Sequence, residues 1–138
     1  MPHIFTLSAY ETSAHDFFTK LLEEKTDLVL DIRLKNTNQL CGFTKRQDLE
    51  YLVTTLTGAK YVHDLRLAPS EALLERYIKH WCNWEEYAKD YKQQMQQENV
   101  RKLFKTSYGR YRSICLLGTA TKKRRSHSEA LQELLAKK

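Results

Sequence analysis

Short apolar runs alternate along this chain with longer segments in which apolar residues recur every three or four positions. The short runs predict strands at residues 3–7, 28–34, 59–65 and 113–117, because they are rich in apolar and β-branched residues. The run at 28–34 has an unbroken apolar centre, which is typical of a strand buried on both faces of a parallel sheet.

The segments between these runs have the spacing of amphipathic helices. They predict helices at residues 14–25, between Thr44 and Gly58, and after Ser126. The longer segment 70–105 is predicted to be mostly helical, in two or three pieces. Its apolar positions form two successive stripes, which are Leu73, Leu74, Tyr77, Ile78 and Trp81, and then Trp84, Tyr87, Tyr91 and Met95.

Three predicted helices begin with a residue that suits an N-cap, followed three residues later by a polar residue of the first turn. These pairs are Ser13 with Asp16, Thr44 with Gln47, and Ser126 with Glu129. Gly58 is suited to end the second helix, because glycine readily adopts the left-handed conformation of a helix C-terminus.

The alternation of strands and helices predicts one α/β domain over residues 1–138. We expect a small, mostly parallel sheet with flanking helices, right-handed crossovers and a helical insertion before the last strand. Ligands of such folds bind in a cleft at the carboxyl ends of the strands, so the residues that follow each strand are the first candidates for a functional site.

Composition narrows the class of protein further. With 138 residues, of which 41% are hydrophobic, the chain can form a real core, and no apolar run reaches the length of a transmembrane helix. The first residues resemble a strand rather than a signal peptide. The three cysteines form no Cys-x-x-Cys pair, so we expect no disulfide framework, no metal site and a cytoplasmic location.

The net charge is +6, and much of the excess lies in the last third of the chain. The densest basic patch is Lys122, Lys123, Arg124 and Arg125. Such a balance favours anionic partners, with nucleic acid or nucleotides first, although four adjacent cations also form ordinary solvated turns.

Asp31 and Arg33 end the second apolar run, where a carboxylate and a guanidinium must either pair or face a cleft. Two residues apart on a strand, they point to the same face. In a functional interpretation, Arg33 grips an anion while Asp31 orients it or accepts a hydroxyl proton. The alternative is a structural ion pair at the end of the strand.

Two histidines extend the candidate site. His63 ends the third predicted strand and could act as an acid or base near neutral pH, or it could be a core histidine bonded to the backbone. His127 lies in the first turn of the last helix, where its ring and the free backbone amides could meet a phosphate, or it could be a simple surface residue.

Several short motifs follow one another in the order seen in the domain-of-unknown-function 488 family, which the chain resembles over nearly its whole length. They are Thr6-Leu7 with Tyr10-Glu11, Asp31-Ile32-Arg33, Gly42-Phe43-Thr44-Lys45, Tyr61-Val62-His63, Leu67-Ala68-Pro69, Trp84-Glu85-Glu86-Tyr87 with Tyr91, and Cys115-Leu116-Leu117. The resemblance implies a compact α/β domain whose activity is poorly defined.

The chain departs from this family near its C-terminus. The family usually carries a cysteine and a glutamate just after the last strand, and a Cys-His-Arg triplet at the start of the last helix. The corresponding residues here are Gly118, Ala120, Ser126, His127 and Ser128, so that only the histidine is kept. A thiolate nucleophile needs its cysteine, so we expect no thiol-dependent catalysis, with Cys115 buried and Cys41 the remaining loop thiol.

Together these residues predict binding of a phosphate-bearing ligand, a nucleotide or nucleic acid, with weak or absent catalysis. Arg33 and Lys45 would contact the anion, Asp31 and His63 would orient it, and His127 with the basic patch would close the site. Tyr10 is placed with them because of its matched motif. The alternatives are an enzyme using Asp31 and His63 as acid and base, and a protein-interaction module using the aromatic helical region. The sequence identifies no cofactor.

Overall fold

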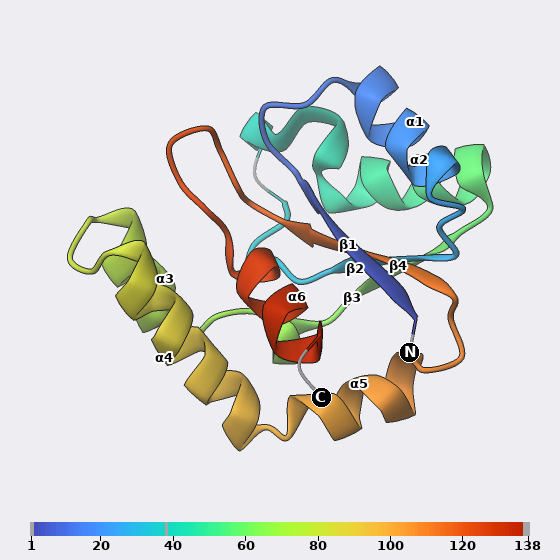
Figure 1. Ribbon diagram of the computed structural model, residues 1–138. Helices are drawn as coiled ribbons and strands as arrows, with labels where there is room; N and C mark the ends of the chain where they lie inside the picture. Colours follow the sequence, from blue (N-terminus) through green and yellow to red (C-terminus); the bar gives the residue numbers. More distant parts are fainter. Residues whose placement is uncertain (1, 38, 137–138) are drawn as a thin grey trace.

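A computed structural model describes residues 2–37 and 39–136, except for the side chains of residues 39–41. These residues form one four-stranded parallel sheet between two layers of helices (Figure 1). In their order across the sheet, the strands are β1 (His3–Ser8), β4 (Ser113–Gly118), β2 (Leu28–Asp31) and β3 (Lys60–His63). The predicted α/β fold is confirmed, although β2 and β3 are shorter than the segments predicted from the apolar runs.

The helices divide between the two faces of the sheet (Figure 1). One face is covered by α1 (Ala14–Glu23) and α2 (Arg46–Thr57). The other is covered by α3 (Glu71–Ile78), α4 (Trp84–Gln97), α5 (Val100–Tyr108) and α6 (His127–Ala136). Two short 3₁₀ helices, η1 (Gln39–Thr44) and η2 (Leu65–Leu67), follow β2 and β3. The predicted helical insertion before the last strand is thus present as α3, α4 and α5.

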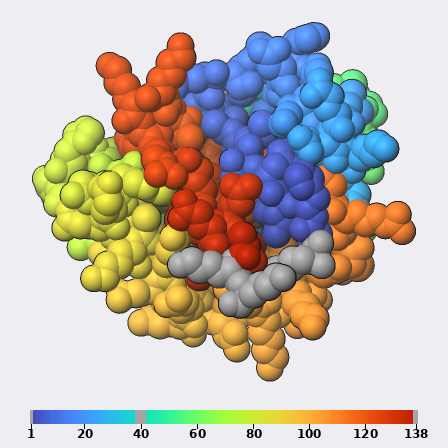
Figure 2. Space-filling model, viewed as in Figure 1, coloured from blue at the N-terminus to red at the C-terminus, as the bar shows by residue number. Residues whose placement is uncertain are grey.

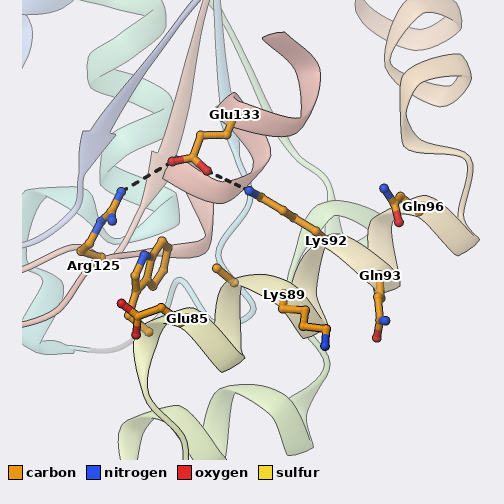
Figure 3. A pocket seen from close by; sticks show the side chains of 9 residues that line it. Glu85, Lys89, Lys92, Gln93, Gln96, Arg125 and Glu133 are labelled. Carbon is orange, nitrogen blue, oxygen red and sulfur yellow. Dashed lines mark hydrogen bonds and ion pairs between the residues drawn. The ribbon is translucent and has the colours of Figure 1, made fainter. Parts of the chain in front are cut away.

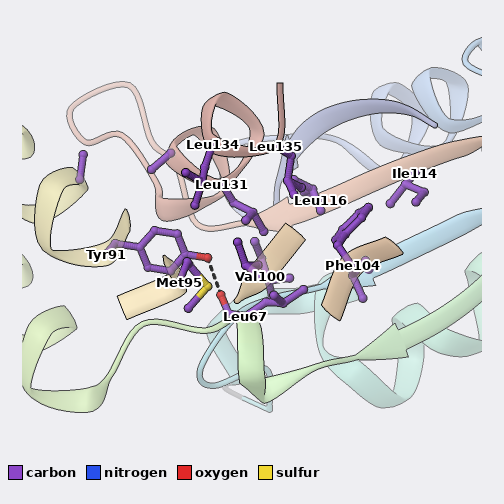
Figure 4. Close-up of a cluster of buried hydrophobic side chains, with 14 of the residues drawn as sticks. Leu67, Tyr91, Met95, Val100, Phe104, Ile114, Leu116, Leu131, Leu134 and Leu135 are labelled. Atoms are coloured by element: carbon purple, nitrogen blue, oxygen red, sulfur yellow. Dashed lines mark hydrogen bonds between the residues drawn. The ribbon is translucent and has the colours of Figure 1, made fainter. Parts of the chain in front are cut away.

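Two separate hydrophobic cores result from the alternation of side chains along the strands. Leu30 and Leu116 point to the core beneath α3–α6, whereas Val29 and Leu117 point to the core beneath α1 and α2. Figure 4 shows the first core, in which the Tyr91 hydroxyl donates a hydrogen bond to the Leu67 carbonyl oxygen at 2.6 Å. Because β2 and β4 are buried on both faces, the sheet holds their carboxyl ends in fixed positions.

The helix caps agree only in part with the sequence. Ser13 caps α1 as predicted, since its hydroxyl accepts a hydrogen bond from the Asp16 amide at 3.0 Å. The prediction that Thr44 caps α2 is wrong, because Lys45 is the N-cap residue and forms no side-chain cap bond. The buried Thr44 hydroxyl instead donates to the Ala9 carbonyl oxygen at 3.0 Å, which ties the chain before α2 to the end of β1.

The cap of α6 forms half of the predicted reciprocal pair. The Ser126 amide donates to the Glu129 carboxylate at 3.0 Å. The Glu129 amide, however, donates to the Ser126 carbonyl oxygen rather than to its hydroxyl. The Ser126 hydroxyl is left to accept a hydrogen bond from the Thr119 amide at 3.0 Å, so it fastens the loop before α6 to the end of β4.

The first apolar stripe ends earlier than predicted. Tyr77 is buried, but α3 ends at Ile78 and the chain turns at His80, which has a φ of 60°. Trp81 therefore leaves the helix face, and 66% of its surface is exposed.

None of the described helices is long and apolar enough to cross a membrane.

Candidate functional site

A pocket of about 200 Å³ lies where the carboxyl ends of β2 and β4 meet α3, α4 and the loop before α6. Its walls include Tyr10, Arg33, Tyr77, Tyr87, Arg124 and His127, and it is called the strand-end pocket below. Tyr10, Arg33, Arg124, Arg125 and His127 of the predicted site residues line this pocket. Asp31, Lys45 and His63 do not contribute to its walls.

Asp31 and Arg33 form a fully buried, bidentate ion pair. The Arg33 Nε and Nη2 atoms donate to the two carboxylate oxygens of Asp31 at 2.8 and 2.7 Å, and Nη2 also donates to the Thr44 carbonyl oxygen at 2.7 Å. Asn36 and Tyr61 donate further hydrogen bonds to the same carboxylate. The Arg33 guanidinium is therefore already engaged by protein groups, and Arg33 lines the pocket as a member of this hydrogen-bonded network.

The ionisation of Asp31 follows from the balance of burial and pairing. Burial alone would raise the pKa of this carboxyl group, but the hydrogen bonds and charge of Arg33, assisted by Tyr61 and Asn36, hold the pKa below its ordinary value. Asp31 is thus a carboxylate at neutral pH. Burial, followed by the charge of Asp31, raises the pKa of Tyr61, which keeps its hydroxyl protonated as a donor.

The two candidate histidines bond successive carbonyl groups of the chain that leaves β2. The His127 Nε2 atom donates to the Ile32 carbonyl oxygen at 2.6 Å, and the His63 Nε2 atom donates to the Arg33 carbonyl oxygen at 2.7 Å. Burial lowers the pKa of His127 to about 4, so this ring is neutral at physiological pH. His127 thus offers the pocket a ring fixed in place and without positive charge.

The basic patch splits into two parts. A bridge between Thr121 and Arg124 folds the loop before α6 into a tight turn, and the Lys122 amide donates to the Glu11 carboxylate at 2.5 Å. Lys122 and Lys123 are exposed at the tip of this turn, whereas Arg124 is half-buried and lines the strand-end pocket. In the space-filling view this loop projects from the surface (Figure 2).

The two arginines of the patch differ in their partners. Arg125 is paired with Glu129 at 3.2 Å and lies over the Trp84 ring, with its guanidinium carbon 4.5 Å from the ring centroid. The Arg125 Nη2 atom approaches the carboxylate of Glu133. Glu133 also accepts a hydrogen bond from Lys92, and all three residues line an open groove beside α4 (Figure 3). The Arg124 guanidinium forms no hydrogen bond or ion pair with any described residue.

Several pocket residues were not among the site residues predicted from the sequence, and two of them are tyrosines. Tyr77 was predicted as an apolar stripe position, and Tyr87 as a stripe position in the aromatic helical region, yet both line the strand-end pocket. Their rings are stacked on each other, with centroids 4.1 Å apart and planes 8° from parallel. Lys35, two residues after Arg33 in the segment that leaves β2, also lines the pocket and could have been found from its position near a strand end.

A family described as "Domain of unknown function DUF488" matches residues 13–135. The chain belongs to this family. No match was found among curated proteins or among solved structures.

Gly118, the last residue of β4, stands where the resemblance leads one to expect a cysteine, and this position has no room for a side chain. A Cβ atom on Gly118 would lie 2.4 Å from the hydroxyl oxygens of both Ser126 and Ser128 and 2.8 Å from the Ser128 Cβ. The serines that stand in the places of the usual cysteine and arginine therefore fill the space that a cysteine at 118 would need.

The two thiols that the structure describes lie away from this position. Cys115 is buried within β4, and burial raises the pKa of its thiol. Cys82 is half-buried in the turn before α4, and burial raises its pKa as well. The side chain of Cys41 lies outside the described residues. The absence of thiol-dependent catalysis stays a prediction.

We expect Gly118→Ala to lower the free energy of unfolding by about 1–3 kcal/mol, because the new methyl group overpacks the space held by Ser126 and Ser128. Chemical denaturation of the two proteins measures this difference. Removing both hydroxyl groups by Ser126→Ala and Ser128→Ala in the Gly118→Ala background should recover part of the loss. Purely additive effects in this cycle would contradict the steric explanation.

Proposed function

We propose that the strand-end pocket binds a phosphate-bearing ligand, a nucleotide or nucleic acid, with weak or absent catalysis. The observation that carries the proposal is the guanidinium of Arg124, a half-buried residue that lines the pocket without a partner among the described residues. Buried and half-buried cations are normally paired, so an unpaired one at a pocket wall is suited to an anionic ligand. Lys35, at the mouth, is exposed and also forms no ion pair with a described residue.

The proposal changes the roles given to the cations from the sequence. Arg33 was expected to grip the anion, but its guanidinium is engaged by Asp31 and Thr44. Lys45 was expected beside it, but this residue is the N-cap of α2 and does not line the pocket. Arg124 and Lys35 take over the contact with the anion, and Arg33 shapes the pocket wall.

The remaining walls suit the sugar or base of a nucleotide. Leu74 and Ile78 of α3 line the pocket together with Tyr77 and Tyr87, so its walls combine apolar and aromatic side chains with the cations. Ligand pockets commonly combine a mostly apolar lining with a few charged groups that fix orientation.

The arrangement of the candidate acid and base favours binding over catalysis. A general base must come within hydrogen-bond reach of the proton that it removes. The Asp31 carboxylate is fully buried and occupied by Arg33, Asn36 and Tyr61. His63 is bonded to the Arg33 carbonyl oxygen and lies outside the pocket walls.

The third alternative, an aromatic interaction surface, receives less support. Tyr87 and Tyr91 are buried in the core beneath α4, and Trp84 is only half-buried. Trp81 is exposed, but it stands apart from these rings in the turn between α3 and α4. The aromatic stripe thus mainly builds the core.

Arg124→Ala should weaken the binding of adenosine 5′-monophosphate by about tenfold or more, because a hydrogen bond to a charged group contributes about 1.5–3 kcal/mol. The matched control is Lys122→Ala with Lys123→Ala, which removes two cations from the exposed tip of the same loop. Titration calorimetry at low salt measures all three affinities.

The control variant should change the affinity by less than about threefold, since exposed charges contribute little. Equal losses in the two variants would mean that the net charge of the loop, rather than the pocket, attracts the nucleotide. No binding to the unmodified protein at low salt would refute the proposed function.

A further inference from the structure

We propose that the strand-end pocket recognises a terminal phosphate monoester, with the Tyr87 hydroxyl donating a hydrogen bond to a phosphate oxygen that also pairs with Arg124. This inference rests on the proposed function and names the end of the ligand that the pocket takes. It assigns to Tyr87 a role in specificity.

The first observation is an unused hydroxyl group. Four tyrosines are buried among the described residues, and three of their hydroxyls donate hydrogen bonds within the protein. The pairs are Tyr77 with the Arg125 carbonyl oxygen at 2.9 Å, Tyr91 with the Leu67 carbonyl oxygen at 2.6 Å, and Tyr108 with the Asp64 carboxylate at 2.5 Å. Tyr87 is only 1% exposed, and its hydroxyl bonds to no described residue. Buried polar groups are nearly always paired, so this exception needs an explanation.

The unused hydroxyl is reachable from the pocket. Thr26 has the only fully enclosed side-chain oxygen or nitrogen without a partner in the part of the chain that the structure describes. The small accessible part of Tyr87 must therefore include its hydroxyl oxygen. Because Tyr87 lines the strand-end pocket, a ligand there supplies the missing partner.

The second observation is the position of Arg124. Burial raises the pKa of the Tyr87 hydroxyl, and the nearby charge of Arg124 acts against this rise. The same charge acts on Tyr77. Arg124 and Tyr87 line the same pocket, so the guanidinium shares it with a hydroxyl that stays protonated and can donate. A phosphate oxygen between them would receive one neutral and one charged hydrogen bond.

The size of the pocket limits which part of a ligand can enter it. Its volume is about 200 Å³, below the roughly 300–1,000 Å³ of pockets that enclose a drug-sized molecule. A phosphodiester carries chain on both sides of its phosphate and cannot bring its oxygens to a hydroxyl that is almost fully buried. A terminal monoester can enter with the phosphate first.

The experiment compares Tyr87→Phe with Tyr91→Phe, whose lost hydroxyl bonds to Leu67 away from the pocket. The probes are adenosine 5′-monophosphate and the dinucleoside monophosphate adenylyl-adenosine without a terminal phosphate. We expect Tyr87→Phe to weaken binding of the monoester about tenfold and to leave the melting temperature equal or higher. Tyr91→Phe should lower the melting temperature and leave binding unchanged. The unmodified protein should prefer the monoester to the diester.

The outcomes separate this inference from the proposed function. If Arg124→Ala weakens monoester binding and Tyr87→Phe does not, the role of Tyr87 is wrong and the proposed function stands. If the unmodified protein binds the diester as well as the monoester, the recognition of a terminal phosphate is wrong. A lower melting temperature for Tyr87→Phe would show a structural bond of the hydroxyl and overturn the inference. Failure of the unmodified protein to bind the monoester overturns both proposals.

Discussion

Replacing Asp31 with alanine should lower the free energy of unfolding by about 3–5 kcal/mol, because it leaves the buried guanidinium of Arg33 without its counter-charge. Both side chains of this pair are fully excluded from solvent. The same substitution also removes the acceptor for Asn36 and Tyr61, so two more buried polar groups lose a partner.

Urea or guanidinium denaturation measures this loss, and Asp90→Ala is the matched control. Asp90 pairs with Arg76 at a similar distance, 2.7 Å, but both side chains are more than 40% exposed. We therefore expect the control to cost less than about 1 kcal/mol. If Asp31→Ala is too unstable to purify, Asp31→Asn keeps the volume and tests the charge. A loss no larger than that of Asp90→Ala would contradict the structural importance of the pair.

The free energy of unfolding should fall by about 3 kcal/mol between pH 7 and pH 4 through His127 alone. The folded state holds the pKa of His127 at about 4, below its ordinary value of 6.5. Between these two values the unfolded chain binds a proton that the folded protein does not. The contribution is therefore fully present above pH 6.5 and is lost as the pH falls toward 4, at up to about 1.4 kcal/mol per pH unit.

The contribution of Asp31 to the free energy of unfolding changes at lower pH than that of His127. Its pKa is depressed in the folded state, so its contribution is present above the pKa of the unfolded chain, about 3.9, and is lost as the pH falls through the folded value. Asp31 thus contributes little to the loss of stability between pH 6.5 and 4.5.

Denaturation curves measured from pH 7.5 to 4.5 for the unmodified protein and for His127→Gln test this expectation. The variant lacks the titrating ring, so its stability should change less with pH, even if the lost bond to the Ile32 carbonyl oxygen lowers it at every pH. His15→Gln is the control, because the His15 side chain is 85% exposed. Parallel curves for His127→Gln and the unmodified protein would show that His127 takes up its proton over the same pH range in the folded protein as in the unfolded chain, which contradicts the expectation.

The fold was predictable because its signals are local. The apolar runs at β2 and β4 and the helical spacing between them directly reflect which faces are buried. The cap at Ser13 was also predictable, since its hydroxyl bonds only three residues ahead. Thr44 failed as a cap because its hydroxyl bonds to Ala9, a residue 35 positions away that no local pattern reveals.

The site was predictable only in outline. The position after β2 drew attention to Arg33, and the first turn of the last helix drew attention to His127; both line the strand-end pocket. The sequence could not show that Arg33 would be engaged by Asp31 while Arg124 has no partner among the described residues, because pairing depends on how distant segments pack. The open hydroxyl of Tyr87 was hidden for the same reason, since tyrosines of one helical stripe all have the same pattern in sequence.

The order of the strands bears on how the protein folds as it leaves the ribosome. The central strand β4 is the last to be synthesised, and β1 pairs with it in register from His3–Ser113 to Ser8–Gly118. Until residues 113–118 emerge, the first strand has no neighbour in the sheet and β2 has only β3. The β1 strand and the β2–β3 pair therefore keep exposed strand edges until residues 113–118 are synthesised. The sheet is thus completed late and through long-range contacts.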